Sequence, residues 1–263
     1  MQTLKELWRF RSYILGSIRR DFNLRYQGSI LGASLVFLVP AFQILIYVLV
    51  FGTLMKGRLQ GNPSIHGYSI YLCSGILFWN LFADLLQRSQ NLYLENANLL
   101  KKAAFPGSAL SVINFASSSI NLLLALGLLF IFLLATSAFP GWRIVGLLPV
   151  WLALAALAVF LGLCIAVLQV FFRDFGALTV IATQTLFWAT PIVYPPEILP
   201  PWILPWLQLN PLFAPVSTAQ ALMLGSALPA ASEWASTLIV FGLAALLASR
   251  LHRLHKADLM DNL

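Results

Sequence analysis

The stretch I-L-G-A-S-L-V-F-L-V-P-A-F-Q-I-L-I-Y-V-L-V-F-G-T-L-M, residues 30–55, contains 26 residues without one Asp, Glu, Lys, Arg or His. An α-helix rises about 1.5 Å per residue, so about 20 apolar residues cross the hydrocarbon core of a bilayer. The stretch therefore predicts a membrane-spanning helix, with a kink at Pro40. It is too long for the apolar part of a secretory signal peptide, and the basic segment before it is also too long.

The composition of the whole chain indicates the same class. Of its 263 residues, 60% are hydrophobic and only 10% are charged. Soluble domains carry about 25% charged residues, so most of this surface is expected to face lipid. The two cysteines, Cys73 and Cys164, lie in apolar runs. They are expected to be small buried side chains and to form neither a disulfide nor a metal site.

Six apolar runs predict an all-α membrane protein in which one transmembrane domain has six spans. The predicted spans cover residues 30–55, 67–86, 108–138, 144–172, 175–194 and 228–249. Six spans place both termini on one side. Lys and Arg then number 13 on that side and 3 on the other, so the positive-inside rule places both termini in the cytoplasm, as for a multi-pass protein of the cytoplasmic (inner) membrane. The same asymmetry accounts for the net charge of +7, and no nucleic-acid partner is expected.

Two segments outside these runs are expected at the membrane surface. Residues 1–26 interleave basic and apolar side chains at helical spacing, which is typical of an interfacial amphipathic helix bound to membrane lipids. A solvated basic N-terminus is the alternative. Residues 195–215 hold seven of the 14 prolines but remain apolar, which favours broken helices that re-enter the outer leaflet. An outer loop that lies flat on the membrane is the alternative.

Residues 95–107, E-N-A-N-L-L-K-K-A-A-F-P-G, form a short amphipathic segment between the second and third runs. Its acid at the start and its two lysines near the end suit the dipole of a short helix, and its Pro-Gly pair ends the element. Its apolar side chains are of a size to fill a cleft on a cytosolic partner. An ordinary interfacial loop is the alternative.

The sequence shows no hydrolytic or redox motif. It contains neither the G-x-x-x-x-G-K-[ST] phosphate loop nor H-E-x-x-H, so we expect no enzyme activity and no cofactor on this chain. His66, His252 and His255 fall in loops or the tail. Asp84 is the only clear ionisable residue inside a run, and Arg88 one turn later is its expected partner. We also expect no polar residues paired at matching depth, which argues against a membrane-embedded enzyme. The near absence of charge inside the runs argues against a proton-coupled carrier.

Five short motifs stand out along the chain: R-Y-Q-G-S-I-L-G at 25–32, N-L-L-K-K-A-A-F-P at 98–106, F-R-D-F at 172–175, P-I-V-Y-P at 191–195 and L-N-P-L at 209–212. Together they resemble one family, the permease subunit of polysaccharide-exporting ATP-binding-cassette transporters, of the O-antigen, lipopolysaccharide or teichoic acid type. Phe37 and Gln220 depart from residues that are common in that family.

The resemblance implies a homodimer with two nucleotide-binding ATPase subunits, which would bind the ATP and Mg. It implies a polyprenyl-pyrophosphate-linked polysaccharide as substrate, and a coupling helix between the second and third spans. Export of teichoic acid, capsule or small lipophilic compounds, and a non-transporting membrane scaffold or enzyme, are the alternatives. The contact with the ATPase is then expected at Glu95, Asn98, Leu99, Leu100, Lys101, Lys102 and Phe105.

Two further sets of residues are candidates for contact with substrate. Arg25, Tyr26 and Arg88 are placed to bind a pyrophosphate at the inner interface, because guanidinium groups bind phosphate bidentately. Plain positive-inside anchoring is the alternative. Aromatic faces suit a glycan pathway, although aromatic residues more often pack; the candidates are Phe37, Tyr47, Phe51, Tyr71, Phe78 and Trp79. Ala158, Gly162 and Ala166 form a small-residue face for helix packing, either within the subunit or across the dimer.

Overall fold

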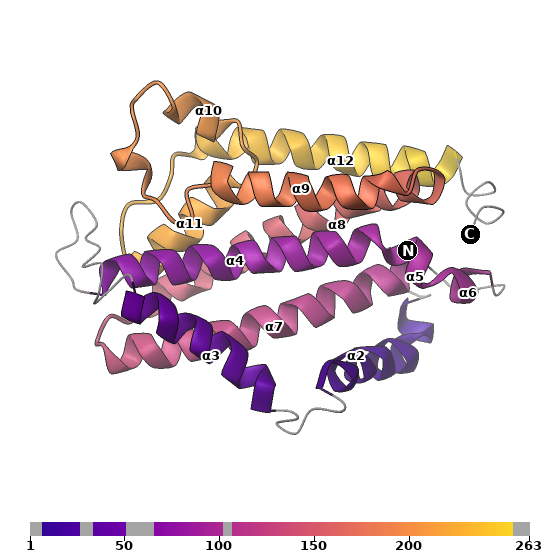
Figure 1. Cartoon of the computed structure of the whole chain (residues 1–263), viewed down its shortest axis with the longest axis horizontal. Coiled ribbons are helices and arrows are strands. Elements are labelled where there is room, and N and C mark those ends of the chain that lie inside the picture. The colour runs from indigo at the N-terminus through magenta and orange to yellow at the C-terminus, as the bar shows by residue number, and fades with distance from the viewer. Residues whose placement is uncertain (1–6, 27–33, 51–65, 102–106, 255–263) are drawn as a thin grey trace.

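The computed structural model describes residues 7–26, 34–50, 66–101 and 107–254. Figure 1 shows the long helices of these ranges lying side by side as a bundle. No strand occurs in the described residues, which confirms the expected all-α class. The α-helices are α2 (Arg11–Tyr26), α3 (Leu35–Tyr47), α4 (Gly67–Gln90), α5 (Leu92–Glu95), α6 (Ala97–Leu100), α7 (Gly107–Ala135), α8 (Leu147–Phe171), α9 (Asp174–Ala189), α10 (Leu204–Gln208), α11 (Phe213–Leu224) and α12 (Ala235–Leu254). Between them lie the 3-10 helices η3 (Gly141–Gly146), η4 (Pro196–Ile198) and η5 (Ala231–Trp234).

Within the described residues, four helices are long and apolar enough to cross a membrane, where the sequence predicted six spans. They correspond to the second, third, fourth and sixth predicted runs, and cover Gly67–Gln90, Gly107–Ala135, Gly141–Phe171 and Ala231–Leu251. The first run is described only over residues 34–50, where α3 and a π-helical turn form a shorter apolar helix. Pro40 lies inside α3, as expected.

The fifth predicted run forms a shorter helix, α9, of 16 residues. The helix ends at Ala189, before the predicted end at Tyr194, because Pro191 follows Thr190. A residue before proline is disfavoured in the helical region, and Thr190 is extended, with φ −103° and ψ 135°. The apolar composition of the run therefore continued past the point where the backbone leaves the helix.

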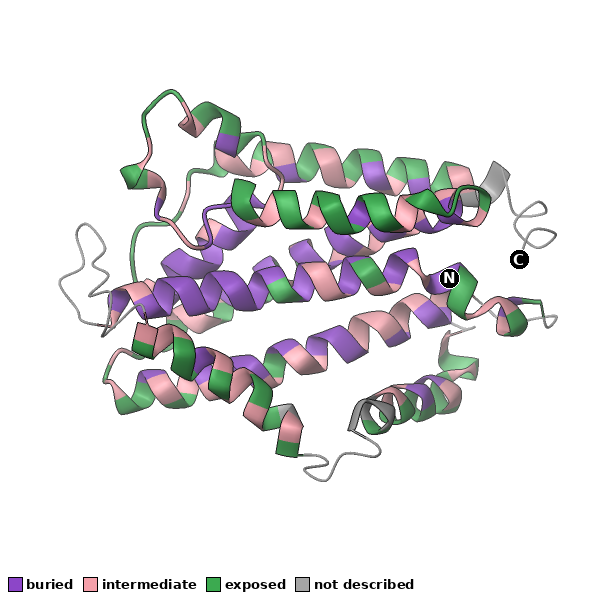
Figure 2. Cartoon of the chain, in the orientation of Figure 1, coloured by how far each residue is buried: buried purple, intermediate pink, exposed green. Residues whose placement is uncertain are grey.

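Helix α4 lies at the centre of the bundle and is enclosed by the rest of the chain, as the purple ribbon in Figure 2 shows. Phe78, Phe82 and Leu85 are each no more than 1% exposed. The helix packs chiefly against α8, α11 and α7. Because lipid is as apolar as leucine, such packing stabilises the bundle through close fit.

The small-residue face of α8 provides that fit. Ala158, Gly162 and Ala166 are buried. A methyl group added at Gly162 would overlap Ser89 Cβ and would lie 2.9 Å from the Leu86 carbonyl oxygen. Both of these contacts are on α4, so the small-residue face packs within the subunit, and the alternative left open by the sequence is resolved for Gly162.

The other end of α4 holds the backbone where it turns after α9. Tyr71 Oη lies 2.6 Å from the Pro191 carbonyl oxygen and 3.0 Å from that of Tyr194. Gln220 of α11 donates Nε2 to the same Pro191 oxygen at 3.2 Å. Helix α11 is buried over most of its 12 residues and ends at Gly225, whose φ of 72° suits a glycine C-cap. The sequence had not predicted this buried helix.

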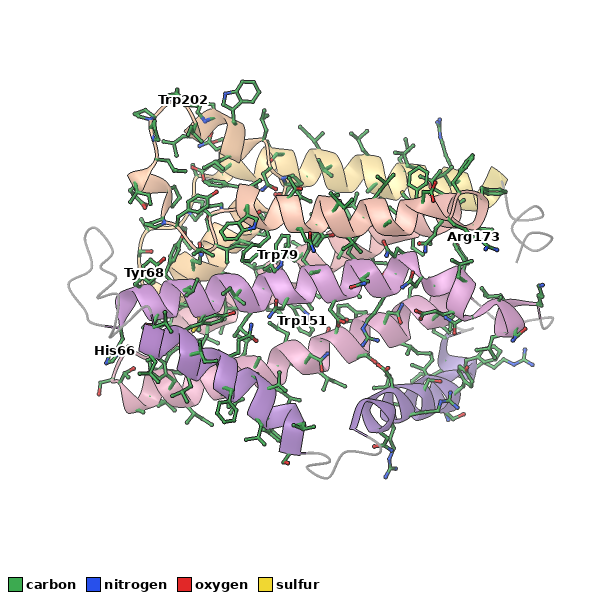
Figure 3. The ribbon with its side chains drawn as sticks, viewed as in Figure 1. His66, Tyr68, Trp79, Trp151, Arg173 and Trp202 are labelled. Carbon is green, nitrogen blue, oxygen red and sulfur yellow. The ribbon has the colours of Figure 1, made fainter. Side chains whose placement is uncertain are left out.

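The bundle has two distinct ends. In Figure 1, α2, α5, α6 and the C-terminal end of α12 lie at one end, and α10 and α11 lie at the other. Figure 3 places Arg173 at the first end and His66 and Trp202 at the second. Along the sides, α9 and α12 expose large apolar side chains such as Ile181 and Leu243. Soluble monomers rarely expose large contiguous apolar patches, so these side faces suit lipid or another protein.

Candidate functional site

One narrow stripe of α4 is not covered by the described chain, and it is polar. Asn80 and Gln87 are the exposed residues of this helix, and they lie seven residues apart on one side. Asp84, half-buried, lies between them on the same side. A helix whose apolar side chains are almost all enclosed therefore presents amide and carboxylate groups outward.

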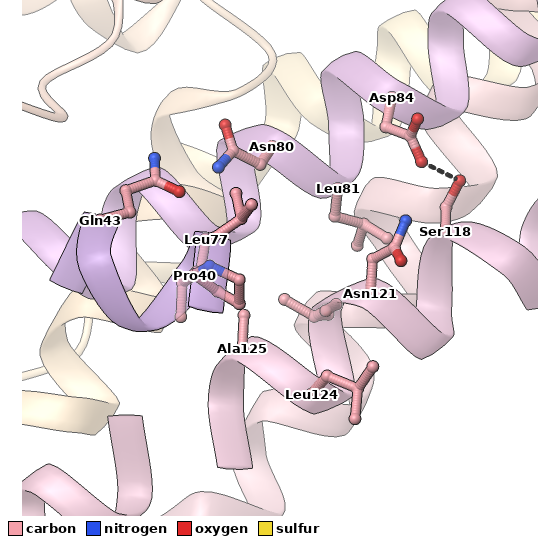
Figure 4. Close-up of a pocket in the computed structure, with 12 residues that line it drawn as sticks. Pro40, Gln43, Leu77, Asn80, Leu81, Asp84, Ser118, Asn121, Leu124 and Ala125 are labelled. Atoms are coloured by element: carbon pink, nitrogen blue, oxygen red, sulfur yellow. Dashed lines mark hydrogen bonds between the residues drawn. The ribbon is translucent and has the colours of Figure 1, made fainter. Parts of the chain in front are cut away.

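A cavity of about 240 Å³ opens beside this stripe, between α3, α4 and α7. Figure 4 shows Gln43 and Asn80 toward one end of the cavity, and Asp84, Ser118 and Asn121 toward the other. The expectation that no polar side chains meet at matching depth is therefore wrong. The three helices contribute one or two polar residues each, and only the fold brings them together.

An ion-pair network lies at the end of this cavity that Asp84 and Ser118 line. Arg88 Nε lies 3.0 Å from Asp84 Oδ1, which confirms the predicted pair, and Arg88 Nη1 lies 3.1 Å from Asp21 Oδ2 of α2. Ser118 Oγ donates to Asp84 at 2.7 Å, and Asn114 Nδ2 donates to the Arg88 carbonyl oxygen at 3.1 Å. The network joins α2, α4 and α7 and balances the charge of Arg88 with carboxylates.

The predicted pyrophosphate site is only partly described. Arg25 and Tyr26 are the last residues of α2, and their side chains lie outside the described residues. Arg88 takes part in the network above, where its guanidinium already binds two carboxylates. The role of these three residues in binding substrate stays a prediction.

The predicted coupling segment is two short helices rather than one. Glu95 ends α5, and α6 begins at Ala97 after a break at Asn96. Desolvation by the surrounding protein, together with the nearby carboxylate of Asp21, raises the pKa of Glu95 despite a hydrogen bond with Asn91.

Within that segment the predicted contact residues are unequally available. Asn98 and Lys101 are exposed and Leu99 is half-buried. Leu100 is only 7% exposed, because it packs in a cluster with Ile14 of α2 and with residues of α5, α7 and α8. Lys102 and Phe105 lie outside the described residues.

The predicted pathway aromatics divide in the same way. Tyr71, Phe78 and Trp79 are buried within the chain, and Trp79 packs edge-on against Phe187 of α9 at 5.4 Å between ring centroids. Phe37 is 52% exposed on α3. Tyr47 is half-buried and accepts a hydrogen bond from Gln43, and Phe51 lies outside the described residues. The amides near the cavity carried no signal in the sequence, because isolated Asn and Gln residues occur in many packed helices.

Comparison with known proteins agrees with this arrangement. The chain is 26% identical over 231 residues to the O-antigen export system permease protein RfbA of Myxococcus xanthus, which covers 87% of this chain and 86% of that protein. Two proteins of the same name from Klebsiella pneumoniae are similar. One is 26% identical over 73% of both chains, and the other is 25% identical over 85% of this chain and 83% of its own length.

The profile of one family, described as ABC-2 type transporter, matches residues 14–224. The matched region begins within α2 and runs to the end of α11. It therefore covers the cavity, the ion-pair network and the segment between α4 and α7. Permease subunits of this kind are not enzymes, as the sequence predicted, and they work with an ATP-binding subunit. The chain therefore belongs to the ABC-2 type transporter family.

Proposed function

We propose that this chain is the channel-forming permease subunit of an ATP-driven exporter that moves a polyprenyl-pyrophosphate-linked polysaccharide across the cytoplasmic membrane. The observation that carries the proposal is the polar stripe of Asn80, Asp84 and Gln87 on an otherwise enclosed helix. A polar stripe facing lipid is unfavourable, whereas one facing a hydrated pathway is not. The names of the relatives, O-antigen export permeases, supply the substrate class.

A second copy of the chain would complete the pathway. Thr179 is the only buried residue of α9, and Gln184 is exposed in the middle of that helix. No described residue hydrogen-bonds to the Gln184 side chain. An amide in hydrocarbon is costly without a partner, so the exposed face of α9 suits contact with a second copy or with the pathway that two copies enclose.

In this proposal the chain has six spans, with both termini in the cytoplasm. Two observations support it. In Figure 1, α3, α4, α7, α8, α9 and α12 run alternately in opposite directions along the bundle. The end that carries α2, α5 and α6 also carries Arg88, Lys101 and Arg173, as the positive-inside rule requires of a cytoplasmic side. The short helices α10 and α11 at the other end would be the re-entrant element.

The driving force would come from two nucleotide-binding subunits that dock on α5 and α6. Glu95, Asn98 and Lys101 of this segment are exposed and Leu99 is half-buried, so these side chains are accessible to such a partner. Leu100 would act from inside by holding the segment against α2. Replacing Leu100 would disturb packing, so it cannot test docking.

The test is the double variant Asn98→Asp with Lys101→Glu in the purified complex with the ATPase. We expect substrate-stimulated ATP hydrolysis to fall at least about tenfold, which corresponds to about 1.4 kcal/mol of lost coupling, while the permease elutes as folded protein. Arg250→Glu reverses an exposed charge at the end of α12 and is the matched control. Coupling that survives the double variant would contradict docking at this segment.

The substrate is tested separately in a strain that lacks the gene. We expect the strain to accumulate lipid-linked glycan in the cytoplasmic leaflet and to lose the polysaccharide from its surface. If the strain accumulates teichoic acid, capsular polymer or small lipophilic compounds instead, the chain would still be an exporter permease, but for that substrate. A strain with a normal surface and no accumulated intermediate would contradict export altogether.

A further inference from the structure

The cavity between α3, α4 and α7 contains amide groups that the described chain does not satisfy. The side chains of Asn80 and Asn121 have no hydrogen-bond partner among the described residues. Gln43 donates Nε2 to Tyr47 Oη at 3.0 Å, but no described residue donates to its Oε1. The cavity therefore offers both donors and acceptors to whatever fills it.

These amides lie at a depth where an unpaired polar group is costly. Asn80 is near the middle of the 24 residues of α4, and Asn121 is near the middle of the 29 residues of α7. Both helices are long and apolar enough to span a membrane. Hydrocarbon offers no hydrogen bonds, so amides at this depth need water or a polar ligand.

The size and the walls of the cavity favour a ligand that is larger than a water molecule. One water molecule needs only about 10–15 Å³ of such space, and the cavity measures about 240 Å³. Its walls combine the amides with the apolar side chains of Pro40, Leu77, Leu81 and Leu122. A sugar-like ring would fit both kinds of wall. Its hydroxyl groups donate and accept hydrogen bonds, and its C–H faces are apolar.

The charge of the cavity favours a neutral ligand. Asp84 reaches the wall as a carboxylate, and Arg88 and the Ser118 hydroxyl bind it there. Among the described residues no Lys or Arg lines the cavity, and Arg88 is also paired with Asp21. An anionic phosphate would meet a carboxylate and find no cation that is not already paired.

We propose that this cavity binds a neutral sugar residue. Asn80 and Asn121 would form hydrogen bonds with its hydroxyl groups, and Gln43 Oε1 would accept a hydrogen bond from a further hydroxyl. The inference rests on the proposed function, because the exported glycan would supply the sugar. It separates the recognition of neutral sugar, in the cavity, from any recognition of pyrophosphate, which needs cations elsewhere. The glycerol hydroxyls of phosphatidylglycerol offer similar hydrogen-bonding chemistry and are the other source of a ligand for this cavity.

The test uses the full-length permease in phosphatidylcholine nanodiscs with a photoreactive alkyl glucoside as probe. We expect cross-links to peptides of α4 and α7, displaced by unlabelled alkyl glucoside. The double variant Asn80→Leu with Asn121→Leu should cut labelling at least about tenfold, which corresponds to about 1.4 kcal/mol of lost binding. Asn23→Leu makes the same change at an exposed amide of α2 outside the cavity and should leave labelling unchanged.

The outcomes separate the sources and the two proposals. Labelling that persists in the double variant, or that never reaches α4 and α7, overturns the cavity assignment. If phosphatidylglycerol displaces the probe as strongly as the glucoside does, the cavity is assigned to lipid headgroups and the sugar assignment is overturned. If the double variant does not fold, Asn121→Ala in the same assay decides. The assay needs no ATPase, so a deletion strain that still exports glycan would contradict the proposed function while leaving a positive labelling result intact.

Discussion

Helices α4 and α9 are both apolar and lie against one another, but they depend on their surroundings in opposite ways. Almost every side chain of α4 is enclosed by its own chain, and the uncovered remainder is polar. Helix α9 has one buried residue, and its threonines donate hydrogen bonds back to carbonyl oxygens of the same helix. The difference indicates that the subunit is built around α4, whereas α9 is left for lipid or for another copy. Changes on α4 should therefore lower stability, and changes on α9 should alter assembly.

The largest effect is expected where α4 meets α8. Gly162→Leu would drive its side chain into Ser89 and the backbone of Leu86, neither of which can move without separating the helices. We expect a loss of about 3 kcal/mol or more, or no folded protein. Size-exclusion elution and thermal unfolding in detergent would measure it. Gly127→Leu is the control, because nothing lies within 4 Å of a Cβ at Gly127. Equal losses of stability in the two variants would contradict the close packing of α4 against α8.

A smaller loss is expected at the C-terminal end of α4. Arg88→Leu would leave Asp84 and Asp21 without their shared cation. Because these side chains are partly exposed, we expect a loss of about 1–3 kcal/mol in unfolding free energy. Adding Asp84→Asn should recover part of the loss, since it removes one uncompensated charge. Strictly additive effects of the two changes would show that the pair does not couple.

The N-terminal end of α4 should respond more weakly. Tyr71→Phe removes the hydroxyl that lies between the Pro191 and Tyr194 carbonyl oxygens. The Pro191 oxygen keeps its bond from Gln220, so we expect a loss of about 1–2 kcal/mol. Tyr194→Phe, which removes an exposed hydroxyl bonded to the Trp188 carbonyl, should cost less than about 0.5 kcal/mol. A larger loss of stability for Tyr194→Phe than for Tyr71→Phe would mean that the hydrogen bonds of Tyr71 do not stabilise the turn after α9.

The smallest effect on unfolding is expected on α9. Ile181→Ser lies on its exposed face and should change the unfolding free energy of the subunit by no more than about 0.5 kcal/mol. If that face meets a second copy, the variant should reduce the dimer fraction measured by cross-linking or native mass spectrometry. Leu243→Ser on the exposed face of α12 should leave the dimer fraction unchanged. A dimer sensitive to Leu243 and indifferent to Ile181 would move the contact to α12.

The sequence predicted the features that depend on neighbouring residues in the chain. The long apolar runs, the Asp84–Arg88 pair one turn apart and the small-residue face at Gly162 were all visible as local patterns. The cavity was not, because Gln43, Asn80 and Asn121 lie on three helices and none is unusual alone. The sequence also missed α11, because it is short, contains Pro215 and follows a proline-rich segment, and its burial comes from α4 and α8. The short amphipathic segment at residues 95–107 was visible in the sequence, but the burial of Leu100 in one apolar cluster with Ile14 of α2 became apparent only in the fold.

That inward leucine has a mechanical consequence. Leu100 joins α6 to Ile14 of α2, to Leu92 of α5 and to the ends of α7 and α8 in one apolar cluster. Any protein that displaces α6 would therefore pull on the surface helix and on two spanning helices together. This end of the bundle would move as one unit, and a displacement at Asn98 would be shared among several helices instead of bending one loop.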